Sequence, residues 1–90
     1  MSRKPTKTSR LRDYLEGKIP DAIALDVLRN ATFYGQEKEL ADVIIKVLEK
    51  GEPVDAVTIF QNSKSQKLLL AYVTLIQEID YIKYQLLLHS

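Results

Sequence analysis

The sequence predicts an all-α protein: a small orthogonal or up-down bundle of four to five helices with a long C-terminal helix. Three observations predict this class. Apolar residues recur at spacings of three and four over most of the chain, as they do on one face of a helix. Glycine and proline, which end and begin helices, stand together at 17–20 and again at 51–53. No glycine or proline follows Pro53, so neither residue interrupts the last segment.

The ninety residues allow one domain, because a chain of this length buries only one shallow core. We expect residues 1–9 to be a disordered basic arm, since MSRKPTKTS is polar and has no periodicity. Residues 10–90 then form a single helical domain. Its first helix, RLRDYLE, is capped by Ser9 and ends at Gly17.

The second helix begins at Pro20, since the N–H that proline lacks would have no partner in the first helical turn. Its expected buried face contains four residues at helical spacing, with Leu28 beside them: Ile23, Val27, Ala31 and Tyr34. Gly35 is placed to stop this helix in the left-handed conformation. The third helix, 36–50, has the clearest pattern of apolar residues on one face: Leu40, Val43, Ile44, Val47 and Leu48.

The segment 53–61 fits a short helix, although VTIF is β-prone and a strand or a linker stays open. We favour the helix, because a proline and an aspartate stand near its start and no partner strand is visible. The residues expected to share its face are Val54, Val57 and Phe60. Ser63 followed by Gln66 has the spacing of a capping box, which predicts the start of the last helix.

The last segment, 64–90, predicts one long helix. Its apolar seam alternates by four and three: Leu68, Tyr72, Leu75, Ile79, Ile82 and Leu86. Further apolar or aromatic residues continue round the helix: Leu69, Leu70, Val73, Ile76, Tyr81, Tyr84, Leu87 and Leu88. A helix that is apolar over so much of its circumference must be covered on several sides. We predict that the seam is a homodimer interface, most simply with two-fold symmetry; the alternative is that it forms the spine of the monomer.

Two stretches nearly repeat each other: LEGKIPDAIAL at 15–25 and LEKGEPVDAVTI at 48–59. Their offset matches the period of tetratricopeptide-type helical arrays. Arg29 and Thr32, however, stand where that motif has a small and an aromatic residue, and two units are too few to stack. We interpret the resemblance as two helix boundaries of the same kind, each with a closing glycine and a proline where the next helix begins.

Composition excludes several kinds of site. The chain contains no cysteine, which removes disulfides, thiolate metal sites and cysteine nucleophiles. The net charge of +1 is unevenly distributed: residues 1–12 carry five basic side chains and no acid, while 13–61 carry ten acids against five bases. No signal-peptide core follows the basic start, and the longest apolar run, 68–76, is about half a membrane span. We expect a cytoplasmic protein that does not enter a membrane.

Catalytic groups are scarce. The single histidine, His89, is the penultimate residue. The sequence shows no Ser/His/Asp set, no glycine-rich phosphate loop and no metal-ligand cluster. Its carboxylates fall on the polar faces of amphipathic helices, where solubility explains them. We expect no enzymatic activity, no metal and no cofactor.

Nucleic-acid binding is the alternative function. The cations that could contact phosphates are Arg3, Lys4, Lys7, Arg10 and Arg12. Ala31 and Gly35 have the spacing of a helix-turn-helix motif, but the helix that follows carries four acids against three bases, which is unfavourable on a surface facing DNA. This alternative gains support if the arm, Lys18 and Arg29 converge on one positive face.

Two functions therefore remain. The leading one is a non-enzymatic protein–protein interaction module: a small adaptor, inhibitor or regulator that is a homodimer through its C-terminal helix. The basic arm would add electrostatic attraction to another protein. The alternative is a small nucleic-acid-binding transcriptional regulator that uses the arm and the helix-turn-helix-like hairpin.

Overall fold

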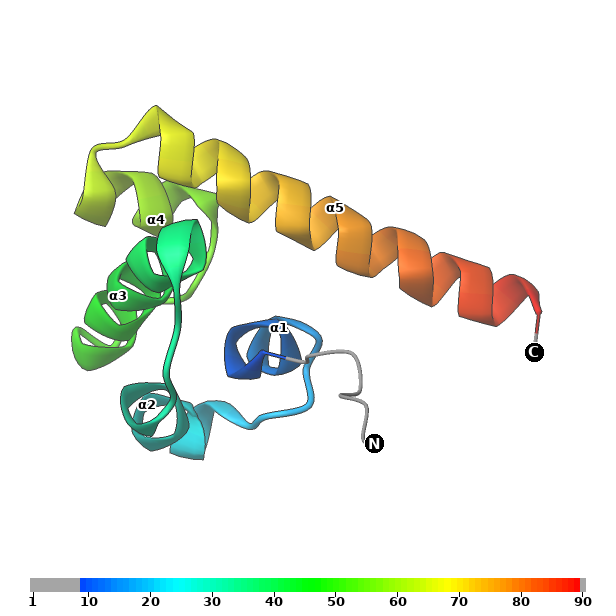
Figure 1. Ribbon diagram of the computed structural model, residues 1–90, viewed down its shortest axis with the longest axis horizontal. Coiled ribbons are helices and arrows are strands. Elements are labelled where there is room, and N and C mark those ends of the chain that lie inside the picture. Colours follow the sequence, from blue (N-terminus) through cyan, green and yellow to red (C-terminus); the bar gives the residue numbers. More distant parts are fainter. Residues whose placement is uncertain (1–8, 90) are drawn as a thin grey trace.

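The computed structural model describes residues 9–89, and these form five helices and no strand, which confirms the all-α class (Figure 1). The helices are α1 (Arg10–Leu15), α2 (Asp21–Asn30), α3 (Gly35–Glu49), α4 (Ala56–Ser63) and α5 (Gln66–Leu88). The predicted basic arm lies outside the described residues except for Ser9. The Ser9 side chain accepts a hydrogen bond from the backbone N–H of Arg12 at 3.0 Å and so caps α1, as predicted.

Gly17 and Gly51 end their helices in the same way. Their φ angles are 87° and 74°, which is the left-handed region. At the first boundary, the Gly17 N–H donates to the carbonyl of Tyr14 at 3.0 Å, and the Lys18 N–H donates to that of Asp13 at 2.9 Å. At the second boundary, the Gly51 N–H donates to the Leu48 carbonyl at 3.0 Å, and the Glu52 N–H donates to the Val47 carbonyl at 3.1 Å. The near-repeat in the sequence therefore marks two helix ends whose free carbonyls are satisfied by the same Schellman motif.

α2 is shorter than predicted, and its predicted face is wrong. The helix ends at Asn30, Ala31 and Tyr34 are extended, and Gly35 begins α3 instead of stopping α2. The intervening Thr-Phe-Tyr sequence favours extended backbone, which explains the early end. The buried residues of α2 are Ala24 and Leu28, one position along from the expected set. The two apolar strips are adjacent on α2, and their pattern alone does not decide which strip turns inward.

α3 contacts three of the other helices, α2, α4 and α5 (Figure 1). Four residues of its predicted apolar face are buried: Leu40, Val43, Ile44 and Val47. Leu48 is half-buried, and Ala41 is buried in addition. The other helices add buried side chains to the same cluster: Leu11, Leu28, Ile59, Leu68 and Tyr72. All five helices thus share a single core.

The segment left open between helix, strand and linker is helical. Asp55 caps α4: its side chain accepts from the Thr58 N–H at 2.9 Å, and the Thr58 hydroxyl accepts from the Asp55 N–H at 3.1 Å. Thr58 and Ile59 are buried, whereas Val57 and Phe60 are exposed, so the predicted face is wrong. The capping box turns Thr58 inward, and the neighbouring Ile59 follows it into the core.

The cap of α5 lies two residues after the predicted one. This cap is Ser65, whose side chain accepts from the Leu68 N–H at 3.2 Å. Ser63, the predicted cap, is the last residue of α4, and its hydroxyl accepts from the Ser65 N–H at 3.1 Å. Lys64 joins the two helices with a φ of 54°, so the chain reverses sharply and lays α5 back over α4.

Gly51→Ala tests the left-handed helix end. No atom lies within 4 Å of the position that the added Cβ would take, so the substitution adds backbone strain alone. We expect the free energy of unfolding to fall by about 1–2 kcal/mol, the cost of this conformation for a residue with a Cβ. Gly51→Asn is the matched control and should lose less, since asparagine tolerates the conformation. Urea unfolding measures both, and equal losses would contradict the explanation.

Tyr14→Phe tests the link between α1 and α2. The Tyr14 hydroxyl donates to Asp21 Oδ1 at 2.9 Å. Burial, followed by this hydrogen bond and the charge of Asp21, raises the pKa of Tyr14 from 10.0 to about 12. Because the pKa of Tyr14 is higher in the folded chain than in the unfolded chain, the neutral hydroxyl stabilises the fold below pH 10. This stability is lost as the pH rises from about 10 to about 12.

We therefore expect the wild-type chain to lose more stability than Tyr14→Phe over that interval. Urea midpoints of both proteins at neutral pH and at several pH values above 10 measure the difference, and lysine deprotonation cancels in the comparison. Parallel pH profiles would show that the pKa of Tyr14 is the same in the folded and unfolded chains, which would contradict the prediction.

Candidate functional site

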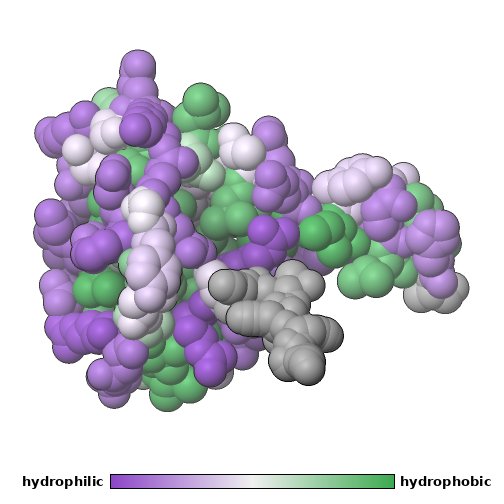
Figure 2. Space-filling view, in the orientation of Figure 1, coloured by the Kyte–Doolittle hydropathy of each residue, from purple (hydrophilic) through white to green (hydrophobic). Residues whose placement is uncertain are grey.

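The most unusual surface is the carboxy-terminal half of α5, which extends past the other helices (Figure 1). Its large apolar or aromatic side chains are 45–71% exposed: Tyr81, Ile82, Tyr84, Leu86, Leu87 and Leu88. Figure 2 shows apolar surface along this projecting half, interleaved with polar surface. Single exposed apolar residues are ordinary, but six large ones on one short helical segment are unusual for a surface that stays in water.

The predicted seam is divided between the core and the surface. Leu68, Tyr72 and Ile79 are 7%, 9% and 2% exposed, so they pack inside the protomer rather than against a partner. Leu75 is half-buried against the same core. The last two seam residues, Ile82 and Leu86, are 45% and 66% exposed. The first part of the seam is therefore the spine of the monomer, and only its end is accessible.

The exposed end of the seam borders a groove of about 270 Å³ between α5 and the segment that follows α1. Ile79, Ile82 and Leu86 form its apolar side, and charged residues lie around them: Glu16, Lys18 and Lys83. The groove thus offers an apolar wall with a charged edge.

A second row of residues follows the opposite side of α5. These residues are also spaced by four and three, and all are exposed: Leu70, Thr74, Gln77, Tyr81, Tyr84 and Leu88. At 3.6 residues per turn, this outer stripe lies roughly opposite the seam. Its apolar members belong to the apolar circumference expected from the sequence. Thr74 and Gln77 interrupt the row with polar side chains, so the sequence pattern does not separate it as a stripe.

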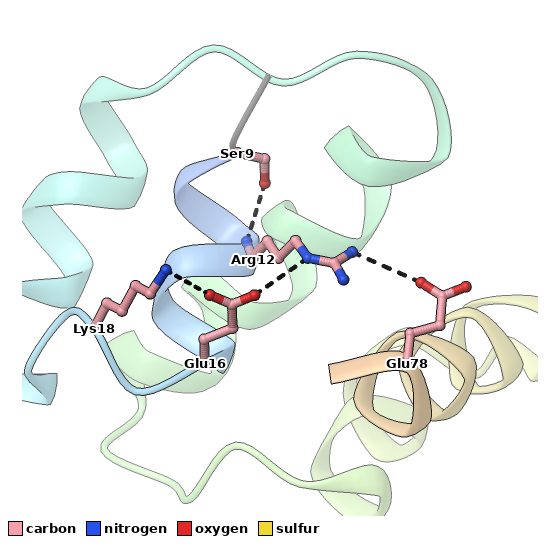
Figure 3. A network of polar contacts seen from close by, with 5 residues as sticks. All are labelled: Ser9, Arg12, Glu16, Lys18 and Glu78. Atoms are coloured by element: carbon pink, nitrogen blue, oxygen red, sulfur yellow. Dashed lines mark hydrogen bonds and ion pairs between the residues drawn. The ribbon is translucent and has the colours of Figure 1, made fainter. Parts of the chain in front are cut away.

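A network of polar contacts fixes α1 against α5 at the base of the projecting half (Figure 3). The Arg12 guanidinium lies 3.3 Å from Glu16 and 3.7 Å from Glu78 on α5. Lys18 lies 3.0 Å from the other oxygen of Glu16. The hydrogen bond from Lys18, with the charges of Lys18 and Arg12, lowers the pKa of Glu16. Glu16 is therefore ionised at neutral pH, and Arg12 links α1 to α5 through Glu78.

The predicted phosphate-contacting residues do not form a free positive surface in the described part of the chain. Arg3, Lys4 and Lys7 lie outside the described residues. Arg10 is 3.5 Å from Asp13, and Arg12 is held in the network above. Lys18 and Arg29 were expected to join the arm on one positive face if the protein binds nucleic acid. Both are paired with acids instead: Lys18 with Glu16, and Arg29 with Glu49.

The helix-turn-helix spacing has a different meaning in the structure. Ala31 is extended and lies beyond the end of α2, whereas the motif requires a small residue inside its first helix. The helix that would read DNA, α3, packs against three others and buries the face described above. The two helices form an ordinary hairpin joined by an extended linker.

Within residues 9–89, no group of three His, Asp or Glu side chains is placed to hold a metal ion. None of the described helices is long and apolar enough to cross a membrane. No protein-family model, curated protein or solved structure matches the chain. The function is therefore inferred from the chemistry and shape of the described surface, of which the projecting half of α5 is the most distinctive part.

Proposed function

We propose that the protein is a non-enzymatic protein–protein interaction module, a small cytoplasmic adaptor, inhibitor or regulator that forms a homodimer through α5. The observation that supports it is the projecting half of α5, where six large apolar or aromatic side chains are 45–71% exposed. Such side chains gain free energy when a partner removes them from water. A surface of this kind binds another macromolecule by shape and apolar burial, without chemistry.

The exposed side chains are divided between two sides of α5. Ile82 and Leu86 border the groove, whereas Tyr81, Tyr84 and Leu88 lie on the outer stripe. A single partner would therefore cover one side of the projecting half. Tyr81 and Tyr84 suit such an interface, because each pairs a large apolar ring with a hydroxyl that tolerates water before binding.

The projecting half is presented on a firm base. Ile79 is 2% exposed directly before it, and Glu78 pairs with Arg12 of α1 beside it. The Tyr72 hydroxyl donates to the Val54 carbonyl at 3.4 Å, which joins α5 to the loop before α4. A helix fixed in this way loses little conformational entropy on binding.

The double variant Tyr84→Asp/Leu86→Asp tests self-association. Both side chains are exposed, at 59% and 66%, so the protomer should fold normally and keep its helical circular dichroism spectrum. We expect light scattering to give twice 10.3 kDa for the wild-type chain, with dissociation at least about 100-fold easier in the variant, because one carboxylate would have to be buried whichever side of α5 the second copy covers. Thr32→Asp, an exposed change in the linker before α3, is the matched control. A wild-type mass of 10.3 kDa at every concentration would show that the chain does not form the proposed dimer.

DNA binding separates the two functions considered from the sequence. We expect no measurable affinity for random duplex DNA at about 50 mM salt, where non-specific binders still hold it through phosphate contacts. The described cations Arg12, Lys18 and Arg29 are each paired with an acid, which leaves phosphates little to gain. Binding that weakens steeply with salt, and that disappears in a variant with Arg3, Lys4 and Lys7 changed to Gln, would favour the nucleic-acid-binding regulator instead.

A further inference from the structure

A second concave surface, a cleft of about 370 Å³, lies beside the first half of α5. The turn that joins α1 to α2 forms one wall, and α5 with the loop before α4 forms the other. Its larger apolar lining residues are half-buried: Leu15, Ile19, Val54 and Ile76. The volume is at the lower end of the range for clefts that hold small molecules, and such clefts combine apolar walls with a few polar groups.

Three polar side chains from three different helices converge on this cleft: Tyr14 of α1, Asp21 of α2 and Tyr72 of α5. The Tyr14 hydroxyl donates to Asp21 Oδ1 at 2.9 Å and so holds the carboxylate beside the cleft. An ionised carboxylate accepts hydrogen bonds at about four sites, and Tyr14 occupies one of them. Among the described residues, no lysine or arginine forms an ion pair with Asp21. Asp21 therefore keeps acceptor capacity for a cation.

The electrostatic potential of the cleft is negative. Burial, followed by the hydrogen bond and the charge of Asp21, raises the pKa of Tyr14 to about 12. Burial, followed by the charge of Asp55, raises the pKa of Tyr72. Both hydroxyls are therefore neutral at pH 7, and each lies in the field of a carboxylate.

No basic side chain of the described part of the chain lines the cleft to offset these carboxylates. Gly17 and Ile19 line it, but Lys18 between them lines the groove beside the projecting half instead. Lys18 also pairs with Glu16 at 3.0 Å, which holds its charge on that side. The cleft thus has a negative charge and apolar walls but lacks a cation of its own among these residues.

From this arrangement we propose that the cleft binds a small organic ammonium ion, a protonated amine carried by an apolar body. The ammonium group donates to Asp21, and the apolar body lies against Ile19, Val54 and Ile76. A hydrogen bond between ionised groups is about twice as strong as one between neutral groups, and the apolar body leaves water. This site is separate from the projecting half of α5, so it goes beyond the proposed function and does not depend on a dimer.

Nuclear magnetic resonance of the full chain tests the site with two probes of the same shape, phenethylammonium and phenethyl alcohol. We expect phenethylammonium to shift the backbone amide signals of residues 14–21 and 72–76. The neutral alcohol should bind at least about 10-fold more weakly, because it cannot form the ionic hydrogen bond. Equal affinities, or shifts spread over the whole chain, would overturn the proposal.

Asp21→Asn removes the charge and keeps the shape of the side chain. Asp21 is exposed, so the circular dichroism spectrum should be unchanged, and we expect phenethylammonium to bind at least about 10-fold more weakly. Asp26→Asn is the matched control, since Asp26 is also exposed on α2 but does not line the cleft. It should bind like the wild type. Equal weakening by both variants would show that only the overall charge attracts the ion.

Two further measurements separate this ligand from other occupants. Acetyl-lysine amide carries the same ammonium group on the unbranched stem of a protein side chain, and tighter binding of this probe would reassign the cleft to a lysine of a partner protein. A variant with Arg3, Lys4 and Lys7 changed to Gln should bind phenethylammonium as the wild type does. A gain in affinity would show that the basic arm of the chain fills the cleft. A wild-type monomer would contradict the proposed dimer and leave this site standing.

Discussion

The length of α5 sets the conditions for the rest of the structure. At 23 residues, it is about 35 Å long, close to the largest dimension of the described chain, 37 Å. The four other helices are shorter and can cover only its first half. Leu68 and Tyr72 join the shared core there, and Ile79 is the last side chain of the seam to be buried. Beyond that point, apolar residues continue although the helices that could cover them have ended, and the exposed surface is the direct result.

The short helices depend on their ends. Helices of six to ten residues are unstable in water on their own, so packing and capping must hold them. Ser9 and Asp55 satisfy N–H groups at the starts of α1 and α4, and Gly17 and Gly51 let carbonyls be satisfied at the ends of α1 and α3. These local bonds fix where each helix begins and ends. The directions of the helices over α3 follow from them, and so does the position of α1 against Glu78 of α5.

Sequence patterns predicted what is local and missed what depends on neighbours. The helix ends at Gly17 and Gly51 and most of the buried face of α3 followed from spacing alone, whereas Gly35 begins a helix instead of ending one. The rotations of α2 and α4 did not follow from spacing, because each carries two adjacent apolar strips. Ala24 is small and buried, which lets this side of α2 lie close to the neighbouring helices. In α4, the capping box between Asp55 and Thr58 sets which side of the helix faces the core. The outer stripe of α5 could be separated from the seam only once the core was known to occupy the other side of the helix.

Self-association and the binding of another macromolecule need not compete for the same surface. The seam turns inward, and the outer stripe faces the other way. If a second copy covers the outer stripe, Ile82 and Leu86 remain beside the groove with Lys18 at its edge, because they lie on the seam side of α5. The groove and the outer stripe lie on different sides of the same projecting helix, so a molecule that covers one side leaves the other side exposed.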